Sequence, residues 1–105
     1  MRLGKARIPP LPEEDMSAEQ TATLATMRER SGRVFNVNKT LMRNMTLYKS
    51  WVPFARHAMS TSSLEPRMRE ILILRVAWNT ESVYEWGQHT LMSLQREPSI
   101  SGFDG

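Results

Sequence analysis

Hydrophobic and polar residues alternate along this chain with the spacing of helices, and each boundary of the pattern carries a helix start or stop signal. Residues 8–16 hold three prolines and predict an extended arm. Ser17 followed by Gln20 is a capping-box pattern, and Gly32 stands where a helix would end. These signals predict a helix between Ser17 and Gly32, followed by a shorter helix at about residues 38–44.

A longer helix is predicted from Leu47 to about Met59, with Thr46 as its N-cap. Pro53 should bend this helix or remove one of its hydrogen bonds. We interpret His57 as a surface or packing histidine, because nothing in its turn resembles a partner. The apolar face recurs at spacings of three and four residues and comprises Leu47, Trp51, Phe54, Ala55 and Ala58.

The most apolar segment follows Pro66, a residue suited to the first position of a helix. A strand is the alternative for so apolar a run, but about fourteen residues without a turn signal favour a helix from Pro66 to about Asn79. We expect this helix to be the central and most buried one. Ser82 then opens a last helix from Val83 to about Gln95. The apolar run of the helix from Pro66 to about Asn79 consists of Ile71, Leu72, Ile73, Leu74, Val76, Ala77 and Trp78.

Length and charge narrow the class of protein. With 105 residues, we expect an arm (1–16), one helical domain (17–95) and a flexible tail (96–105). The net charge of +3 lies largely in the first ten residues, so we expect no nucleic-acid partner. No apolar stretch reaches the length of a secretory signal core or a membrane span, and we expect a cytoplasmic protein without a membrane partner.

The chain has no cysteine, which excludes disulfides, thiolate metal sites and a thiol nucleophile from its own residues. Its histidines and carboxylates lack the spacing of a known ligand motif, so we expect no metal and no cofactor. Neither a glycine-rich phosphate loop nor a serine nucleophile elbow is present.

Three residues could move protons together. Glu85 and His89 stand four positions apart on the last predicted helix and share a face. Glu70 lies in the first turns of the apolar helix, where an acid must be paired or functional. Two simpler interpretations remain open: Ser82 and Glu85 also match a capping box, and Glu70 could pair with a nearby arginine. Those arginines are Arg67, Arg69 and Arg75.

Two segments of the chain read RIPPLPEEDMSAEQ and NVNKTLMRNMTLYKSWVPFARHAMSTSSLEPRMREILILRVAWNTESVYEWGQH. Together they resemble the carboxymuconolactone decarboxylase family, which includes the alkylhydroperoxidase D-like proteins. The most specific part is REILILRVAW, a short turn and YEWGQH, within a resemblance that covers roughly Arg7 to His89. It implies an all-α fold, an alkylhydroperoxidase D-like helical bundle that is incomplete at the C-terminus.

The resemblance also implies roles for individual residues. His89 and Glu70 match the histidine and glutamate of the family's proton relay, whereas Ser82 and Glu85 occupy the two cysteine positions of its peroxidase branch. A peroxiredoxin-like label therefore fits the family, but the thiol mechanism cannot run on these residues. The decarboxylase branch needs no thiol, and His89 supported by Glu85 or Glu70 could protonate the enolate left by loss of carbon dioxide.

The resemblance implies a small-molecule acid or lactone as substrate and a homo-oligomeric protein. Trp78, Tyr84 and Trp86 are candidate substrate contacts, with ordinary core packing as the alternative. After His89, TLMSLQREPSISGFDG replaces the family's further helices. A truncated product, a non-catalytic paralogue and a short form completed by partner chains all remain open. The functional alternatives are accordingly a decarboxylase-like lyase and a non-catalytic or truncated subunit that self-associates.

Overall fold

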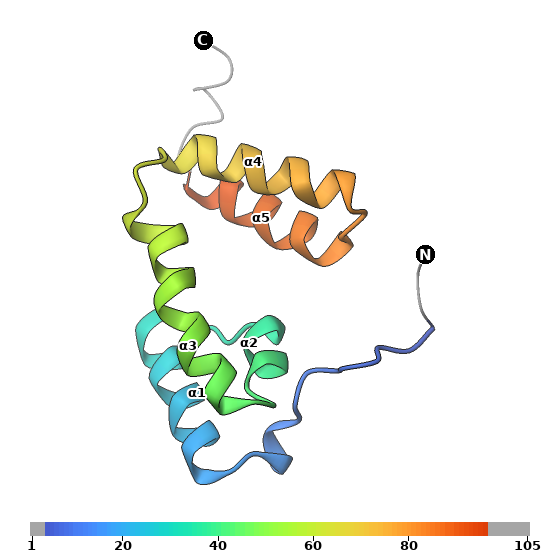
Figure 1. The fold of residues 1–105 in the computed structure, drawn as a ribbon, viewed down its shortest axis with the longest axis vertical. Coiled ribbons are helices and arrows are strands. Elements are labelled where there is room, and N and C mark those ends of the chain that lie inside the picture. The colour runs from blue at the N-terminus through green and yellow to red at the C-terminus, as the bar shows by residue number, and fades with distance from the viewer. Residues whose placement is uncertain (1–3, 97–105) are drawn as a thin grey trace. The chain divides into compact units, whose positions relative to one another are not determined.

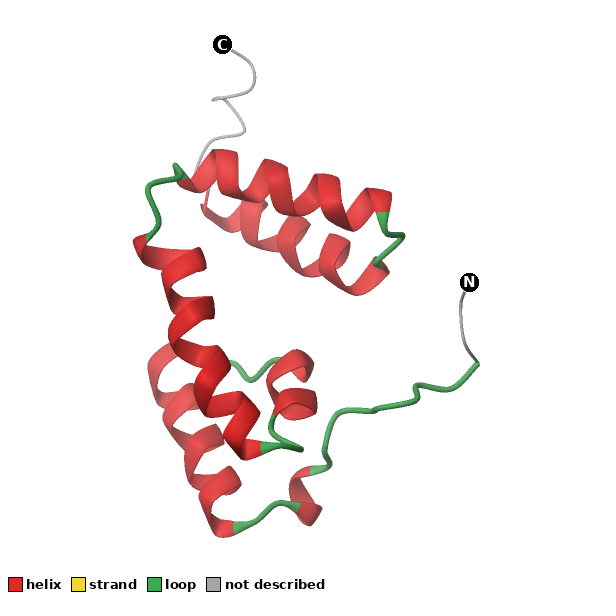
Figure 2. Ribbon diagram, viewed as in Figure 1, coloured by secondary structure: helices red, strands yellow, loops and turns green. Residues whose placement is uncertain are grey.

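Every regular element in the computed structural model, which describes residues 4–96, is a helix (Figures 1 and 2). The predicted all-α fold is therefore confirmed. The chain divides into two compact units, the first ending at His57 and the second beginning at Ala58. The elements are η1 (Glu13–Asp15), α1 (Ala18–Ser31), α2 (Asn36–Leu41), α3 (Met45–Arg56), η2 (His57–Thr61), α4 (Pro66–Asn79) and α5 (Val83–Arg96).

Helix α1 begins and ends where its capping residues predict. The N–H of Gln20 donates to the Ser17 hydroxyl at 3.2 Å, and the N–H of Ser17 donates to the Gln20 side-chain oxygen at 2.8 Å. Gly32 ends the helix in the left-handed conformation, with φ of 73°. Its N–H donates to the carbonyl of Arg28 at 2.8 Å, so both ends of α1 follow from local rules.

Leu24, Met42 and Tyr48 form the buried core of the first unit, which α1, the end of α2 and α3 share. Burial raises the pKa of the Tyr48 hydroxyl, because the phenolate would lose hydration there. Partly buried hydrophobic residues around this core are Met16, Met27, Val34, Leu41, Met45 and Val52.

Helix α3 differs from its prediction at its start, its end and its buried face. Asn44, not Thr46, is the N-cap, and its side chain accepts the N–H of Leu47 at 3.1 Å. The helix continues through Pro53 to Arg56 and passes into a π-helical turn. The predicted apolar face is wrong, because the side that carries Tyr48 meets the core. The other side leaves Leu47, Trp51 and Phe54 exposed by 50%, 43% and 63%.

The proline-rich arm is attached to the first unit at several points. The N–H of Leu11 donates to the carbonyl of Lys39 at 3.2 Å, and Arg43 Nε donates to the carbonyl of Pro9 at 2.7 Å. Glu13, within the single 3-10 turn η1, binds Arg28 at 2.6 Å and Lys39 at 3.2 Å. These contacts hold the arm against α1 and α2.

Helices α4 and α5 form an antiparallel hairpin in the second unit (Figure 1). Helix α4 spans the predicted residues, Pro66–Asn79, and the Ser82 hydroxyl accepts the N–H of Glu85 at the start of α5. Gly87 inside α5 predicts close packing, but an added Cβ would meet no described atom within 4 Å. The backbone turns at Glu81, which has φ of 56°.

Helix α4 carries more buried residues than any other described helix, as predicted, but its apolar run is not surrounded by neighbours. Only Arg69, Glu70 and Ala77 are buried, because α5 covers just one side of α4 within this unit. A continuous apolar run cannot distinguish a surrounded helix from one with a single neighbour. The exposed hydrophobic side chains of α4 are Met68, Ile71, Leu72, Val76 and Trp78.

The Glu13 contacts predict acid sensitivity of the first unit. Hydrogen bonds from Arg28 and then Lys39 lower the pKa of the Glu13 carboxyl, so its contribution to stability is present above the ordinary glutamate pKa. That contribution is lost as pH falls through the lowered value. Urea unfolding over a pH series should show Glu13→Gln less stable than wild type near neutral pH, with a difference that shrinks in acid. Glu14→Gln is the matched control, and a gap that does not depend on pH would contradict the assignment.

Candidate active site

The centre of the second unit is a buried acid–imidazole pair. Glu70 comes from the first half of α4 and His89 from the middle of α5, and only 5% and 8% of these residues are exposed. The Oε2 atom of Glu70 lies 2.6 Å from Nδ1 of His89. The structure therefore brings together two of the three predicted catalytic residues across the helix interface.

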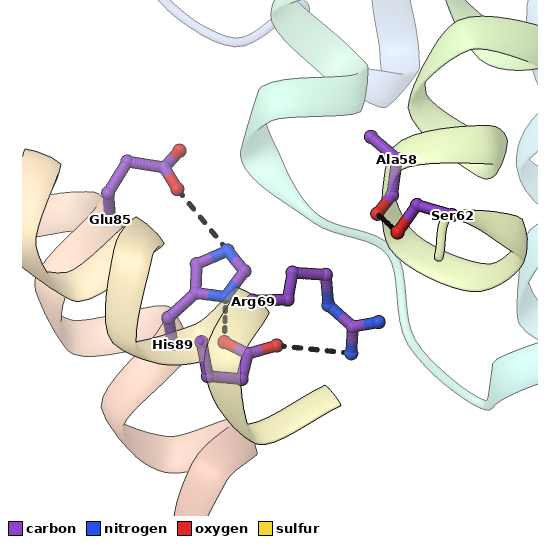
Figure 3. A network of polar contacts seen from close by, with 6 residues as sticks. Ala58, Ser62, Arg69, Glu85 and His89 are labelled. Carbon is purple, nitrogen blue, oxygen red and sulfur yellow. Dashed lines mark hydrogen bonds and ion pairs between the residues drawn. The ribbon is translucent and has the colours of Figure 1, made fainter. Parts of the chain in front are cut away.

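Glu85 faces the other side of the same imidazole ring (Figure 3). Its Oε2 atom lies 3.4 Å from His89 Nε2, and its side chain is 42% exposed. Only half of the predicted capping box forms, because Ser82 accepts the backbone N–H of Glu85 while the Glu85 carboxylate reaches His89. The cap and the acid–imidazole contact are thus compatible. The catalytic roles of these residues stay predictions.

Arg69 is a member of this buried group that sequence reasoning treated only as one of three possible ion-pair partners. It is 7% exposed, and its Nη2 atom lies 3.5 Å from Oε1 of Glu70. Its Nε atom has no hydrogen-bond partner among the described residues. The most specific part of the family resemblance opens at Arg69, but periodicity alone does not separate Arg69 from Arg67 or Arg75, since burial depends on which side of α4 meets α5.

The geometry defines what the imidazole can do. A carboxylate at Nδ1 favours the tautomer that carries its hydrogen on Nδ1, which leaves Nε2 to accept or donate a proton. Glu70 also stabilises the cation that forms when Nε2 gains a proton. Glu85, partly exposed and facing Nε2, can exchange that proton with a bound molecule. The arrangement suits general acid–base chemistry.

A groove with a volume of about 420 Å³ lies beside this proton path. Its lining is mainly aliphatic, and Glu85 is the one ionisable group among the described residues that form it. Glu85 therefore links the groove to His89. The lining residues are Leu72, Ile73, Val76, Ala77, Thr80, Ser82 and Glu85.

The three aromatic residues proposed as substrate contacts are not in that lining. Trp78, Tyr84 and Trp86 are 66%, 37% and 42% exposed, so they do not form a buried core either. The rings of Trp78 and Trp86 contact each other at a centroid distance of 5.6 Å. Substrate contact by these residues stays a prediction.

Two further properties of residues 4–96 concern metal ions and membranes. No group of three or more histidine, cysteine or acidic side chains in this range is arranged to hold a metal ion. No helix within the same range has the length and apolar character needed to cross a membrane.

The geometry predicts unequal costs for removing the two carboxylates. Glu70→Ala should destabilise the protein by about 3–5 kcal/mol, because it leaves buried Arg69 and His89 without their shared partner. Glu85→Ala should cost about 1 kcal/mol or less, because that carboxylate is partly hydrated. Urea unfolding of both variants measures the difference, and equal losses would contradict the buried pair as the stabilising contact.

The chain is similar to one known protein family. Residues 46–97 match the model of the Carboxymuconolactone decarboxylase family. The matched segment contains α4, α5, the Glu70–His89 pair, Glu85 and the whole groove lining. No curated protein and no solved structure matches the chain.

Proposed function

Because the chain belongs to the carboxymuconolactone decarboxylase family through residues 46–97, we propose that its second unit is the proton-transfer site of a decarboxylase-like lyase. The substrate would be a small carboxylated lactone or a related acid. One observation carries the proposal: a buried carboxylate holds one nitrogen of His89, while the other nitrogen faces the acid that lines the groove.

The proposed reaction breaks the carbon–carbon bond to the substrate's carboxylate. Carbon dioxide leaves, and the bonding electron pair enters the conjugated system of the lactone as an enolate. One proton must then be delivered to carbon. An aliphatic lining suits this step once the open side of the groove is covered, because water is then kept from an anion that a positioned acid is to protonate.

The three polar residues take different parts in that delivery. Glu85 meets the substrate and gives up the proton, and His89 restores it through the contact between Nε2 and the Glu85 carboxylate. Glu70 positions the ring through Nδ1 and stabilises its cationic form. A peroxidase reaction is not proposed, because Ser82 and Glu85 stand where that branch has cysteines and the chain contains none.

The test is the loss of turnover when the imidazole is removed. His89→Gln should lower kcat for release of carbon dioxide from a carboxylated lactone by about 100-fold or more. His57→Gln is the matched control, since His57 is the other histidine of the chain and is exposed. Equal turnover by His89→Gln and wild type would rule out the relay.

Self-association is a second candidate function, and the exposed surface of α4 supports it. Leu72 and Val76 form part of the groove and are 47% and 60% exposed, so one side of the groove lacks a cover within its own unit. Exposed apolar surface of this kind typically marks an interface. We propose that a second copy of the chain covers it, in a homo-oligomer that is either the active form or a non-catalytic assembly.

Sedimentation over a concentration series tests this assembly. The wild-type protein should exceed the monomer mass of 12.1 kDa, and Trp78→Glu should return it to that mass. Trp51→Glu, which changes an exposed aromatic residue of α3 in the other unit, is the control and should leave the mass unchanged. A folded monomer at every concentration would exclude the proposal, as would equal dissociation by both variants.

A further inference from the structure

Arg69 is a buried cation, and its Nε donor has no hydrogen-bond partner among the described residues. A guanidinium group carries five N–H donors, and burial without partners is costly for such a group. The contact with Glu70, at 3.5 Å, is at the long limit for a hydrogen bond, and Nε has no partner among the described residues. Glu70 places its other oxygen 2.6 Å from His89, so Arg69 shares the Glu70 carboxylate with the imidazole.

The start of α4 adds a second source of positive potential. Glu65 is the N-cap residue but makes no side-chain capping bond, and Pro66 occupies the first helical position. The first N–H groups of a helix lack intrahelical partners, and the helix dipole makes this end attractive to anions. No acidic residue lies in the first turn of α4.

The direction of the Arg69 side chain joins these two features. Helical side chains lean toward the N-terminus of their own helix, which favours placement of the guanidinium group toward the uncapped end. Figure 3 shows this group extending to the opposite side of His89 from Glu85. The anion-attracting features of the second unit are thus separate from the groove, which Glu85 lines.

Helix α5 contributes two hydroxyls at the same end of the hairpin. Thr90 Oγ1 and Ser93 Oγ are buried and lack hydrogen-bond partners among the described residues. Because α5 runs antiparallel to α4 and His89 pairs with Glu70, residues after His89 lie level with the start of α4. The unpartnered buried polar atoms of the described chain are Arg69 Nε and these two hydroxyl oxygens.

We propose that this end of the hairpin binds a small oxyanion, with Arg69 as its principal ligand. A carboxylate or phosphate offers paired acceptor oxygens that match the fork of a guanidinium group. The backbone N–H groups at the start of α4 and the α5 hydroxyls supply further donors. This site is distinct from the proposed proton path, and its occupancy does not depend on turnover.

The test is anion binding to the whole protein. Thermal unfolding is followed in acetate, in phosphate and in chloride at equal ionic strength, and the Arg69 Nε–H resonance is followed in the nitrogen-15 NMR spectrum. We expect acetate, phosphate or both to raise Tm saturably above the chloride value and to shift that resonance. A larger response to acetate identifies a carboxylate site, and a larger response to phosphate identifies a phosphate site.

Matched variants locate the binding. Arg69→Gln should raise the dissociation constant for the anion about tenfold or more, because it removes a charged donor. Arg75→Gln removes an exposed arginine from the same helix and should leave binding unchanged. Binding retained by Arg69→Gln overturns the proposal, as does a wild-type protein that responds to neither oxyanion more than to chloride. If Arg69→Gln does not fold, the wild-type resonance decides: an Arg69 signal that does not move overturns the proposal.

Discussion

The second unit depends on the contact between Glu70 and His89. In a two-helix hairpin, the side chains that meet at the centre usually form an apolar core. Here Arg69, Glu70 and His89 are buried, and Ala77 is the single buried hydrophobic residue beside them among the described residues of this unit. Burying these groups is unfavourable unless they bind one another, so this interface depends on the 2.6 Å contact, and removal of either partner would leave a buried polar group uncompensated.

That contact also orders the chemistry around it. With Glu70 bound at Nδ1, the second nitrogen of the imidazole is directed to Glu85 and, through Glu85, to the groove. With a polar interface, the apolar residues of α4 remain on the outside, where Val76 and Trp78 are 60% and 66% exposed. A polar interface and an apolar exterior both suit a site that is completed by association.

Local rules predicted much of the helix pattern and failed where packing decides. The Ser17–Gln20 box, Gly32 and Pro66 fixed helix ends because each acts on its own backbone. Asn44 and Thr46 are both able to cap a helix, and the backbone conformation selects Asn44. The burial of α4 and the exposed side of α3 depend on neighbouring helices, which periodicity does not identify.

The candidate site was only partly predictable for the same reason. The spacing of Glu85 and His89 placed them on one helical face, and an acid on an apolar helix made Glu70 a candidate. Only the family resemblance matched Glu70 to the same relay, because nineteen positions separate it from His89. Arg69 was missed as a site residue, since adjacency to Glu70 did not distinguish it from two other arginines. The exposed positions of Trp78 and Trp86 follow from how α4 and α5 pack, which composition does not specify.

The hydrogen position on His89 tests the central claim most directly. Two-bond proton–nitrogen NMR of histidine-labelled protein distinguishes the two neutral tautomers, with exposed His57 as an internal reference. The account predicts a hydrogen on Nδ1, donated to Glu70, in every protonation state of the His89 ring that is observed. A neutral His89 ring with its hydrogen on Nε2 and none on Nδ1 would contradict the account.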